Sequence, residues 1–184
     1  MIFPTPSPRI APVMPDAIAS DMIPLRIGHG YDLHRLQASG TLMLGGLSVA
    51  DGLSPVAHSD GDVVLHALVD ALLGAMAWGD IGEHFPNNDP RWKDAPSRVF
   101  VATVYDKVRA AGYVVQNLDV TILAERPRLK AVKKPMTDSL AGLLSIAPAQ
   151  VNVKAGTNEG CDAIGRGEAI AAHAVVLLLM ADPD

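Results

Sequence analysis

The pattern of apolar and polar positions divides residues 25–180 into candidate strands and helices. Apolar runs bounded by glycine, proline or polar turn residues predict strands. We expect strands at 25–31, 113–124, 151–155 and 169–180, a strand pair at 41–50 that turns at Gly45 and Gly46, and helices at 60–78, 97–111 and 131–145. The intervening residues 80–96 are rich in Gly, Pro and Asn, so we expect a loop there.

The segment 60–78 is the clearest of the predicted helices. Ser59 is placed to cap its N-terminus, with Asp62 three residues further on, as in a capping box. Its apolar sequence is interrupted by Asp62, His66 and Asp70. These residues are spaced by four, so they lie on one helical face, and a polar stripe within so apolar a helix calls for an explanation.

Strands and helices alternate irregularly, which indicates an α+β fold. We expect a single-domain α/β sandwich with a small mixed four-stranded sheet and helices on one face. The last strand, 169–180, is apolar almost throughout, so a partner subunit is a candidate to cover the other face. The proline-rich residues 1–24 match neither a secretory signal nor a transit peptide. We expect a disordered extension there, or an upstream start before Met22, and one folded domain at residues 25–184.

Composition narrows the class of protein. Of the 184 residues, 49% are hydrophobic and 19% charged, as in an ordinary globular domain. The net charge of −5 and the lack of a dense basic run disfavour a nucleic-acid binder. No apolar run has the length of a bilayer span. The single cysteine, Cys161, excludes an intramolecular disulfide and favours a reducing, cytoplasmic location. An acidic protein still binds a polyanion where metal ions match the charge.

A carboxylate and two imidazoles are candidate metal ligands. Asp32 and His34 lie two residues apart after the first strand, so they project to the same side of an extended segment. Together with His66 they make three protein ligands and leave a fourth tetrahedral position open, as in catalytic zinc sites. Each motif alone is better explained by a solvated polar face or by a hydrogen bond of helix packing. Taken together, the residues leave a structural role and a metal site equally open.

Three further segments offer groups for phosphate or for a hard cation. Residues 57–62 precede a helix N-terminus, where backbone N–H groups favour phosphate, although a simple helix cap explains them too. Thr157 and Glu159 follow a strand end, and a carboxylate such as Glu159 is a ligand that Mg²⁺ accepts beside phosphate oxygens. Arg166 is placed either to bind an anion in bidentate fashion or to pair with Glu168.

Six short motifs, taken in order, resemble a known family. They are GHGYDLH at 28–34, AHSDGD at 57–62, ALVDALLG at 67–74, GDIG at 79–82, FP at 85–86 and GRGE at 165–168. In this order and spacing they are similar to the cyclodiphosphate synthases of the non-mevalonate isoprenoid pathway. The resemblance extends from about residue 26 to residue 180, which is almost the whole chain without its N-terminal segment.

The resemblance implies a divalent-metal-dependent lyase of isoprenoid biosynthesis. Its substrate would be 4-diphosphocytidyl-2-C-methyl-D-erythritol 2-phosphate, which closes to 2-C-methyl-D-erythritol 2,4-cyclodiphosphate and releases CMP. It also implies a homotrimer with active sites between subunits. By the same resemblance, Asp32, His34 and His66 would hold Zn²⁺, and Glu159 would hold Mg²⁺ or Mn²⁺ together with the substrate phosphates.

The resemblance also assigns roles around the substrate. His58 and Thr157 match residues that stabilise the transition state. The residues implied to contact the substrate are Asp32, Leu33, His34, His58, Ser59, Asp80, Ile81, Gly82, Phe85, Pro86, Asn87, Asn88, Asp89, Ala124, Glu125, Arg126, Pro127, Arg128, Leu129, Lys130, Gly156, Thr157, Asn158, Glu159, Ala163 and Arg166. Among them, Asn87, Gly156, Asn158, Ala163 and Arg128 differ from the residues that the family most often has.

Two other functions fit the same residues. A metal-dependent phosphodiesterase or phosphatase would use the same ligands with water as the nucleophile, and would give linear products. A non-catalytic trimeric scaffold or regulatory ligand-binding module would keep its partner binding after loss of His66. The ligand residues alone do not choose the nucleophile, so the resemblance carries the choice of a cyclase.

Overall fold

The computed structural model describes residues 25–181, and its secondary structure follows the expected order. The strands are β1 (Leu25–Gln37), β2 (Thr41–Leu44), β3 (Leu47–Asp51), β4 (Ser54–Pro55), β5 (Tyr113–Leu123), β6 (Val151–Gly156) and β7 (Ala169–Met180). The helices are α1 (Val63–Met76), α2 (Ile81–His84), α3 (Arg98–Ala110), α4 (Lys133–Leu144) and α5 (Asp162–Gly165), with short 3₁₀ turns η2 (Pro90–Trp92) and η3 (Pro148–Gln150). The predicted extension at residues 1–24 lies outside the described residues.

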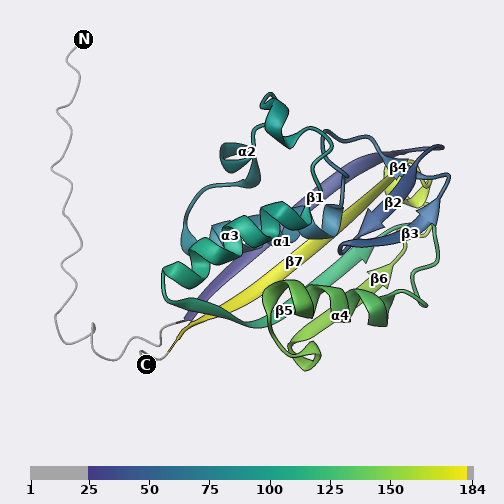
Figure 1. Ribbon diagram of the computed structural model, residues 1–184. Coiled ribbons are helices and arrows are strands. Elements are labelled where there is room, and N and C mark those ends of the chain that lie inside the picture. Colours follow the sequence, from purple (N-terminus) through teal and green to yellow (C-terminus); the bar gives the residue numbers. More distant parts are fainter. Residues whose placement is uncertain (1–24, 182–184) are drawn as a thin grey trace, which may run out of the picture.

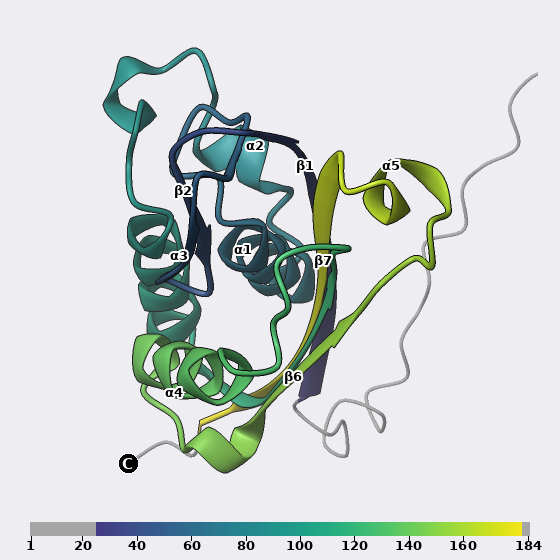
Figure 2. The ribbon, with the colours of Figure 1, turned by 90° about the vertical axis from the view of Figure 1, so that its right-hand side faces the viewer.

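The elements form two layers. One sheet has the strand order β4-β1-β7-β5-β6, and helices α1, α3 and α4 lie on one of its faces (Figure 1). The hairpin β2–β3 lies on the same side as these helices (Figure 2). Strands β5 and β6 are parallel and the other neighbours are antiparallel, so the sheet is mixed as expected. The single-domain α+β prediction is therefore confirmed.

The predicted number of strands is wrong, because the main sheet has five strands and not four. The fifth is β4, which pairs with the end of β1 through Leu36 and Pro55 and through Gln37 and Ser54. A strand of two residues is too short to leave an alternating pattern in the sequence. Its pairing with a distant partner, rather than its own composition, makes it a strand.

Helix α1 lies directly on β1, and two glycines make this close approach possible. A Cβ atom on Gly28 would lie 1.9 Å from the carbonyl oxygen of Ala71, and one on Gly30 would lie 1.9 Å from that of Ala67. Ala67, Ala71 and Ala75 repeat every four residues, so their small side chains line the face of α1 that meets the strand. The helix axis is thereby held close to β1, where it places His66 beside the strand.

The start of α1 is fixed by a buried carboxylate. Asp62 is the N-cap residue, and its Oδ1 accepts hydrogen bonds from the backbone N–H groups of Val64 and Leu65, both at 3.1 Å. The same carboxylate accepts from Gly45 N at 2.9 Å and from Gly46 N at 2.7 Å, in the turn of the β2–β3 hairpin. Asp62 is therefore a structural residue that joins the hairpin to the helix.

The opposite face of the sheet carries exposed apolar side chains on β1, and on β5 and β6 it carries the ion pair of Asp119 and Lys154. On β1, Leu25, Ile27, Tyr31 and Leu33 are 43%, 71%, 46% and 42% exposed. Helix α5 is on this side, near one end of the sheet (Figure 2). Within residues 25–181 no helix combines the length and apolar character that crossing a bilayer requires. The exposed apolar face is of the kind that marks an interaction surface.

Candidate active site

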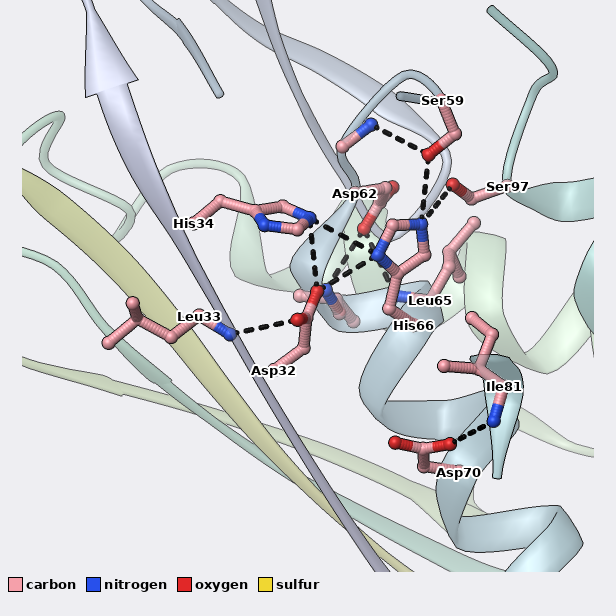
Figure 3. Close-up of polar contacts among 12 residues, drawn as sticks. Asp32, Leu33, His34, Ser59, Asp62, Leu65, His66, Asp70, Ile81 and Ser97 are labelled. Carbon is pink, nitrogen blue, oxygen red and sulfur yellow. Dashed lines mark hydrogen bonds and ion pairs between the residues drawn. The ribbon is translucent and has the colours of Figure 1, made fainter. Parts of the chain in front are cut away.

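Two elements bring the three predicted metal ligands together. Asp32 and His34 project from the helix-covered face of β1, and His66 projects from the first turn of α1 toward them (Figure 3). Asp32 Oδ2 lies 2.9 Å from His66 Nδ1 and 3.3 Å from His34 Nε2, and the two ring nitrogens are 3.3 Å apart. The predicted cluster is confirmed as a group that could hold a metal ion.

The spacing of these atoms fits a divalent ion. Oxygen and imidazole ligands bind Zn²⁺ at about 2.0–2.2 Å, so neighbouring ligands of a tetrahedral site lie roughly 3.3 Å apart. All three donor atoms are within 4.8 Å of one another, and His66 is 9% exposed. One carboxylate and two imidazoles leave a coordination position for a substrate oxygen or for water.

Burial favours the neutral form of one imidazole, which is the form that binds a metal ion. The pKa of His34 is lowered chiefly by burial, while Asp32 acts in the opposite direction and His66 adds to the lowering. The neutral imidazole carries the lone pair that a metal ion needs. At neutral pH, His34 is therefore held in its metal-binding form.

The polar stripe predicted on α1 separates into three roles. Asp62 bonds to the β2–β3 turn, and only His66 faces the ligand cluster. Asp70 accepts a hydrogen bond from Ile81 N at 2.7 Å and so anchors the start of α2 (Figure 3). Burial raises the pKa of Asp70, against the effect of that hydrogen bond. Three residues of one helical face therefore contact three different parts of the molecule: the β2–β3 hairpin, the ligand cluster and the start of α2.

Two serine hydroxyls contact the other nitrogen of His66. Ser97 Oγ lies 2.9 Å and Ser59 Oγ 3.1 Å from His66 Nε2 (Figure 3). The prediction that Ser59 caps α1 is wrong, because Asp62 occupies the N-cap position. Ser59 Oγ instead accepts from Gly61 N at 3.2 Å, which turns its hydroxyl toward the histidine.

A pocket of about 490 Å³ opens beside the ligand cluster. Its lining combines polar groups from the loop before α1 with an aromatic wall. The lining residues are Asp32, His34, Val56, Ala57, His58, Ser59, His66, Ile81, Gly82, Phe85, Asn87, Trp92 and Phe100. Within the described chain, the buried ring nitrogens His58 Nε2 and Trp92 Nε1 have no hydrogen-bond partner. We call this pocket the metal-side pocket.

Aromatic residues far apart in sequence form one wall of the metal-side pocket. Phe85 stacks on Phe100 with ring centroids 4.6 Å apart, and Trp92 meets both rings edge-on. Sequence reasoning included Phe85 and missed Trp92 and Phe100. Trp92 falls in a segment expected to be loop, and Phe100 is an ordinary apolar position of a helix, so neither carries a signal for a pocket.

A second pocket of about 470 Å³ lies toward the other edge of the sheet, where β5 and β6 end. Its lining contains three cationic side chains and several small or apolar residues. These residues are Ala124, Glu125, Pro127, Arg128, Leu129, Lys130, Lys133, Ala155, Gly156 and Thr157. All of them except Lys133 and Ala155 belong to the residues that the resemblance implies to contact the substrate. We call this pocket the basic pocket.

The remaining predicted contact residues line neither pocket. They are Leu33, Asp80, Pro86, Asn88, Asp89, Arg126, Asn158, Glu159, Ala163 and Arg166. Several have local partners instead: Glu159 Oε1 accepts from Thr157 Oγ1 at 3.0 Å, and Arg166 donates to Glu168 at 3.0 and 3.1 Å. Asp80 caps α2 through Glu83 N at 3.1 Å. Glu159 therefore stands apart from the three-ligand cluster within one chain.

The two pockets are separated across the sheet. Asp32 pairs with Ala172, Ala172 pairs with Ile122, and Ile122 pairs with Ala155, which gives one row of residues over four strands. Neighbouring strands are about 4.8 Å apart, so this row spans roughly 14 Å from Asp32 to Ala155. The pockets have no lining residue in common.

Comparison with known proteins gives consistent matches over the folded region. A model of the YgbB family matches residues 25–179. A 2-C-methyl-D-erythritol 2,4-cyclodiphosphate synthase from a Nostoc species is 47% identical over 158 residues, which are 86% of this chain and 96% of that protein. The protein of the same name from Methylococcus capsulatus is 52% identical over 153 residues, which are 83% and 97% of the two chains.

A solved structure shares the fold. It is described as IspF from Plasmodium falciparum in a complex with CDP. It matches with a TM-score of 0.77 and 31% sequence identity, and the match covers 88% of this chain and 100% of that chain. The arrangement of sheet and helices described above is therefore shared over the whole length of that chain.

Proposed function

This chain belongs to the YgbB family, and from that premise we propose that it acts as a 2-C-methyl-D-erythritol 2,4-cyclodiphosphate synthase. It converts 4-diphosphocytidyl-2-C-methyl-D-erythritol 2-phosphate to the cyclic diphosphate and releases CMP, a step of isoprenoid biosynthesis by the non-mevalonate pathway. The observation that carries the proposal is the cluster of Asp32, His34 and His66 at the wall of the metal-side pocket.

The reaction joins two ends of one molecule. An oxygen of the 2-phosphate forms a bond to the β-phosphorus, and the bond from that phosphorus to the bridging oxygen breaks, so the electron pair leaves with CMP. Folding the substrate into a cyclising pose removes much of the entropic barrier, because nucleophile and electrophile are already linked. The chain therefore has to bind, bend and shield its substrate, and needs no covalent intermediate.

Both reacting groups are anionic, so their repulsion has to be offset. Zn²⁺ on Asp32, His34 and His66, and Mg²⁺ or Mn²⁺ on Glu159 with the substrate phosphates, would supply positive charge to the phosphoryl oxygens. His58 Nε2 lacks a partner within the described chain, which supports its role as a donor to the substrate in the transition state. The aromatic wall at Phe85 limits access of water to the reacting groups.

The nucleotide end belongs in the basic pocket. Arg128, Lys130 and Lys133 supply positive charge to the diphosphate, and the segment from Ala124 to Lys130 offers backbone groups to the cytosine ring. The CDP in the Plasmodium falciparum complex supports a cytidine nucleotide as the ligand type of this fold. Thr157 is in the lining of the same pocket, which supports a contact between its hydroxyl and the phosphates.

A homotrimer would unite the two pockets. One chain holds the metal-side pocket and the basic pocket roughly 14 Å apart by strand count, with no residue in common. The exposed apolar face at Leu25, Ile27 and Tyr31 is available for contact between copies. Each complete site would then combine the metal-side pocket of one subunit with the basic pocket of another. A cytoplasmic location stays a prediction.

Metal removal tests this function directly. We expect the chelator-treated, folded protein to release no CMP from the cytidine diphosphate substrate, and Zn²⁺ with Mg²⁺ to restore the release. Far-ultraviolet circular dichroism checks that the fold persists without metal. CMP release at an unchanged rate after complete metal removal would contradict the proposed site.

A further inference from the structure

Ser97 has a single hydroxyl hydrogen and two polar neighbours that compete for it. The residue is fully buried, and its Oγ contacts a carboxylate oxygen of Asp60 on one side and His66 Nε2, at 2.9 Å, on the other. An ionised carboxylate only accepts hydrogen bonds, so the hydroxyl hydrogen of Ser97 points to Asp60. The oxygen of Ser97 can then only accept from the histidine. On this side of the ring, a hydrogen on Nε2 is therefore favoured. On the other side, Asp32 Oδ2 lies 2.9 Å from Nδ1 and competes for a hydrogen there until a metal ion lies between the two atoms.

Asp60 is held as an acceptor by its other contacts as well. Its Oδ2 accepts from Ser97 N at 3.0 Å, and its Oδ1 accepts from Asp62 N at 3.3 Å. Both backbone partners of this carboxylate donate to it, one to each oxygen. These two N–H groups orient the carboxylate, so that one of its oxygens faces the Ser97 hydroxyl as an acceptor.

The neighbouring serine agrees with this arrangement but does not decide it. Ser59 Oγ lies 3.1 Å from His66 Nε2 and accepts from Gly61 N. A hydroxyl in that position can either donate to the histidine or accept from it. The contact between Ser97 and Asp60 is the one that favours a particular hydrogen position on His66. With Nε2 protonated, both serine oxygens serve as acceptors of one N–H group.

The consequence lies on the opposite side of the ring. In a neutral imidazole one nitrogen is a donor and the other carries a lone pair, so a hydrogen on Nε2 leaves the lone pair on Nδ1. His66 Nδ1 is the atom that faces Asp32 Oδ2 at 2.9 Å and His34 Nε2 at 3.3 Å. The lone pair therefore points to the position that a metal ion would take.

We propose that Asp60 and Ser97 form a positioning relay that fixes the Nε2–H tautomer of His66 and so presents Nδ1 to the metal ion. The proposal rests on the proposed metal site and deepens it, because it names two residues outside the ligand set that control the tautomer of His66. Asp60 and Ser97 are 37 positions apart, and the start of α3 brings them together beside α1. Neither residue is itself a proposed metal ligand, and Ser97 contacts the cluster only at His66 Nε2, the ring nitrogen opposite the metal position.

The variant Asp60→Asn tests the relay most sharply. An asparagine side chain can donate its amide hydrogen to Ser97 Oγ, which turns the serine hydroxyl toward His66 Nε2 and favours the tautomer with hydrogen on Nδ1. We expect the zinc dissociation constant, measured by competition with a chromophoric chelator, to rise about 10- to 100-fold. In the metal-free proteins, ¹⁵N NMR of the histidine rings should show a smaller fraction of His66 with its hydrogen on Nε2 in the variant than in the wild type.

Two further variants separate positioning from general damage. Ser97→Ala removes one acceptor and leaves Ser59, so we expect a smaller rise in the zinc dissociation constant, and Ser97→Thr should restore the wild-type value. Asp138→Asn makes the same chemical change at an exposed ion pair on α4 and should change neither readout. Both readouts are obtained without substrate, so failure of the relay is distinguishable from failure of the proposed reaction.

Two results would overturn the relay. One is a folded Asp60→Asn protein that keeps the wild-type zinc affinity and the Nε2–H tautomer. The other needs no variant: zinc-loaded wild-type protein whose His66 ring shows no hydrogen-bonded Nε2–H group. The second measurement decides the question even if Asp60→Asn does not fold.

Discussion

At the scale of single residues, His66 is the ligand whose loss is easiest to interpret. Its Nδ1 faces the metal position, and His66 is not among the residues that line the basic pocket. We expect His66→Ala to lose bound zinc and to lower CMP release at least about 100-fold, since removal of a ligand should cost no less than removal of an outer-shell partner. Zinc content by mass spectrometry and the CMP assay measure the two effects. Lys107→Ala, on α3 away from the pocket, is the control.

The pH dependence of the metal-free protein tests the environment of His34. Burial lowers its pKa in the folded chain below the ordinary value of 6.5, so the folded state binds a proton less readily than the unfolded state. This contribution to the free energy of unfolding is present above pH 6.5 and is lost as the pH falls through the lowered pKa. Urea titrations from neutral to mildly acidic pH should therefore show declining stability.

The variant His34→Gln isolates this effect, because it removes the titrating ring and keeps a polar side chain. We expect its unfolding free energy to decline less steeply over the same pH range than that of the wild type. Burial raises the pKa values of Asp62 and Asp70 toward this range, but both carboxyl groups are present in the two proteins, so the difference in slope between them reports on His34. Equal slopes for the two proteins would argue against the buried neutral imidazole.

The ligand cluster could be predicted from the sequence, and the relay behind it could not. Asp32 and His34 are two apart on a strand, and His66 interrupts an apolar helix, so each leaves a local pattern. Asp60 and Ser97 reach one another only through the packing of the loop before α1 against the start of α3. Contacts of that kind have no period in the sequence, and a serine before a helix is most simply interpreted as a cap.

At the scale of elements, the contact between α1 and β1 decides whether the ligands meet. A Cβ on Gly30 would lie 1.9 Å from the carbonyl oxygen of Ala67, so Gly30→Ala must displace the helix that carries His66. We expect the free energy of unfolding to fall by about 1–3 kcal/mol or more and zinc affinity to fall with it. Urea unfolding and chelator competition measure both.

A second glycine provides the matched control for this change. Gly142 is exposed in α4, and a Cβ there would meet nothing within 4 Å. Gly142→Ala should therefore stabilise the protein by about 0.5–1 kcal/mol through helix propensity and leave zinc affinity unchanged. If Gly30→Ala behaved in the same way as Gly142→Ala, the account of the helix–strand contact would be wrong.

The long elements could be predicted from their patterns, whereas the short ones could not. The predicted segments 97–111 and 131–145 correspond to α3 and α4, and the pair at 41–50 corresponds to β2 and β3. The helix α2 falls in the predicted loop and has only four residues. So short a helix is not stable by propensity. It is held by the cap from Asp80 and by the bond from Ile81 N to Asp70.

At the scale of the whole molecule, the exposed face of β1 should hold the subunits together. Ile27 is 71% exposed, so Ile27→Asp should leave the subunit folded while placing a charge in the proposed interface. We expect sedimentation velocity to show a trimer for the wild type and a monomer for the variant. The variant should keep its zinc affinity and lose CMP release, because the basic pocket of the neighbour is absent.

An exposed valine on the other layer is the control for the interface. Val99 on α3 is 42% exposed and lies among the helices, so Val99→Asp should remain trimeric and active. A monomeric wild-type protein that releases CMP at full rate would contradict the shared site. A trimeric Ile27→Asp protein would contradict the proposed position of the interface on β1.

The apolar last strand indicated the need for a cover on the second face, but the sequence does not locate two separate pockets. The metal-side pocket is lined by residues of β1, of α2 and of the loop that precedes α1. The basic pocket is lined by residues at the ends of β5 and β6. Their separation follows from the strand order, in which β7 lies between β1 and β5. Strand order depends on long-range pairing, which leaves no mark in any single segment.

The most direct test of the central claim is the identity of the product. ³¹P NMR of the metal-loaded protein with 4-diphosphocytidyl-2-C-methyl-D-erythritol 2-phosphate, Zn²⁺ and Mg²⁺ should show equal amounts of CMP and a cyclic diphosphate. CMP accompanied only by linear phosphates would show that water is the nucleophile and that the protein is a hydrolase. No turnover by folded, metal-loaded protein would contradict catalysis and favour a ligand-binding module.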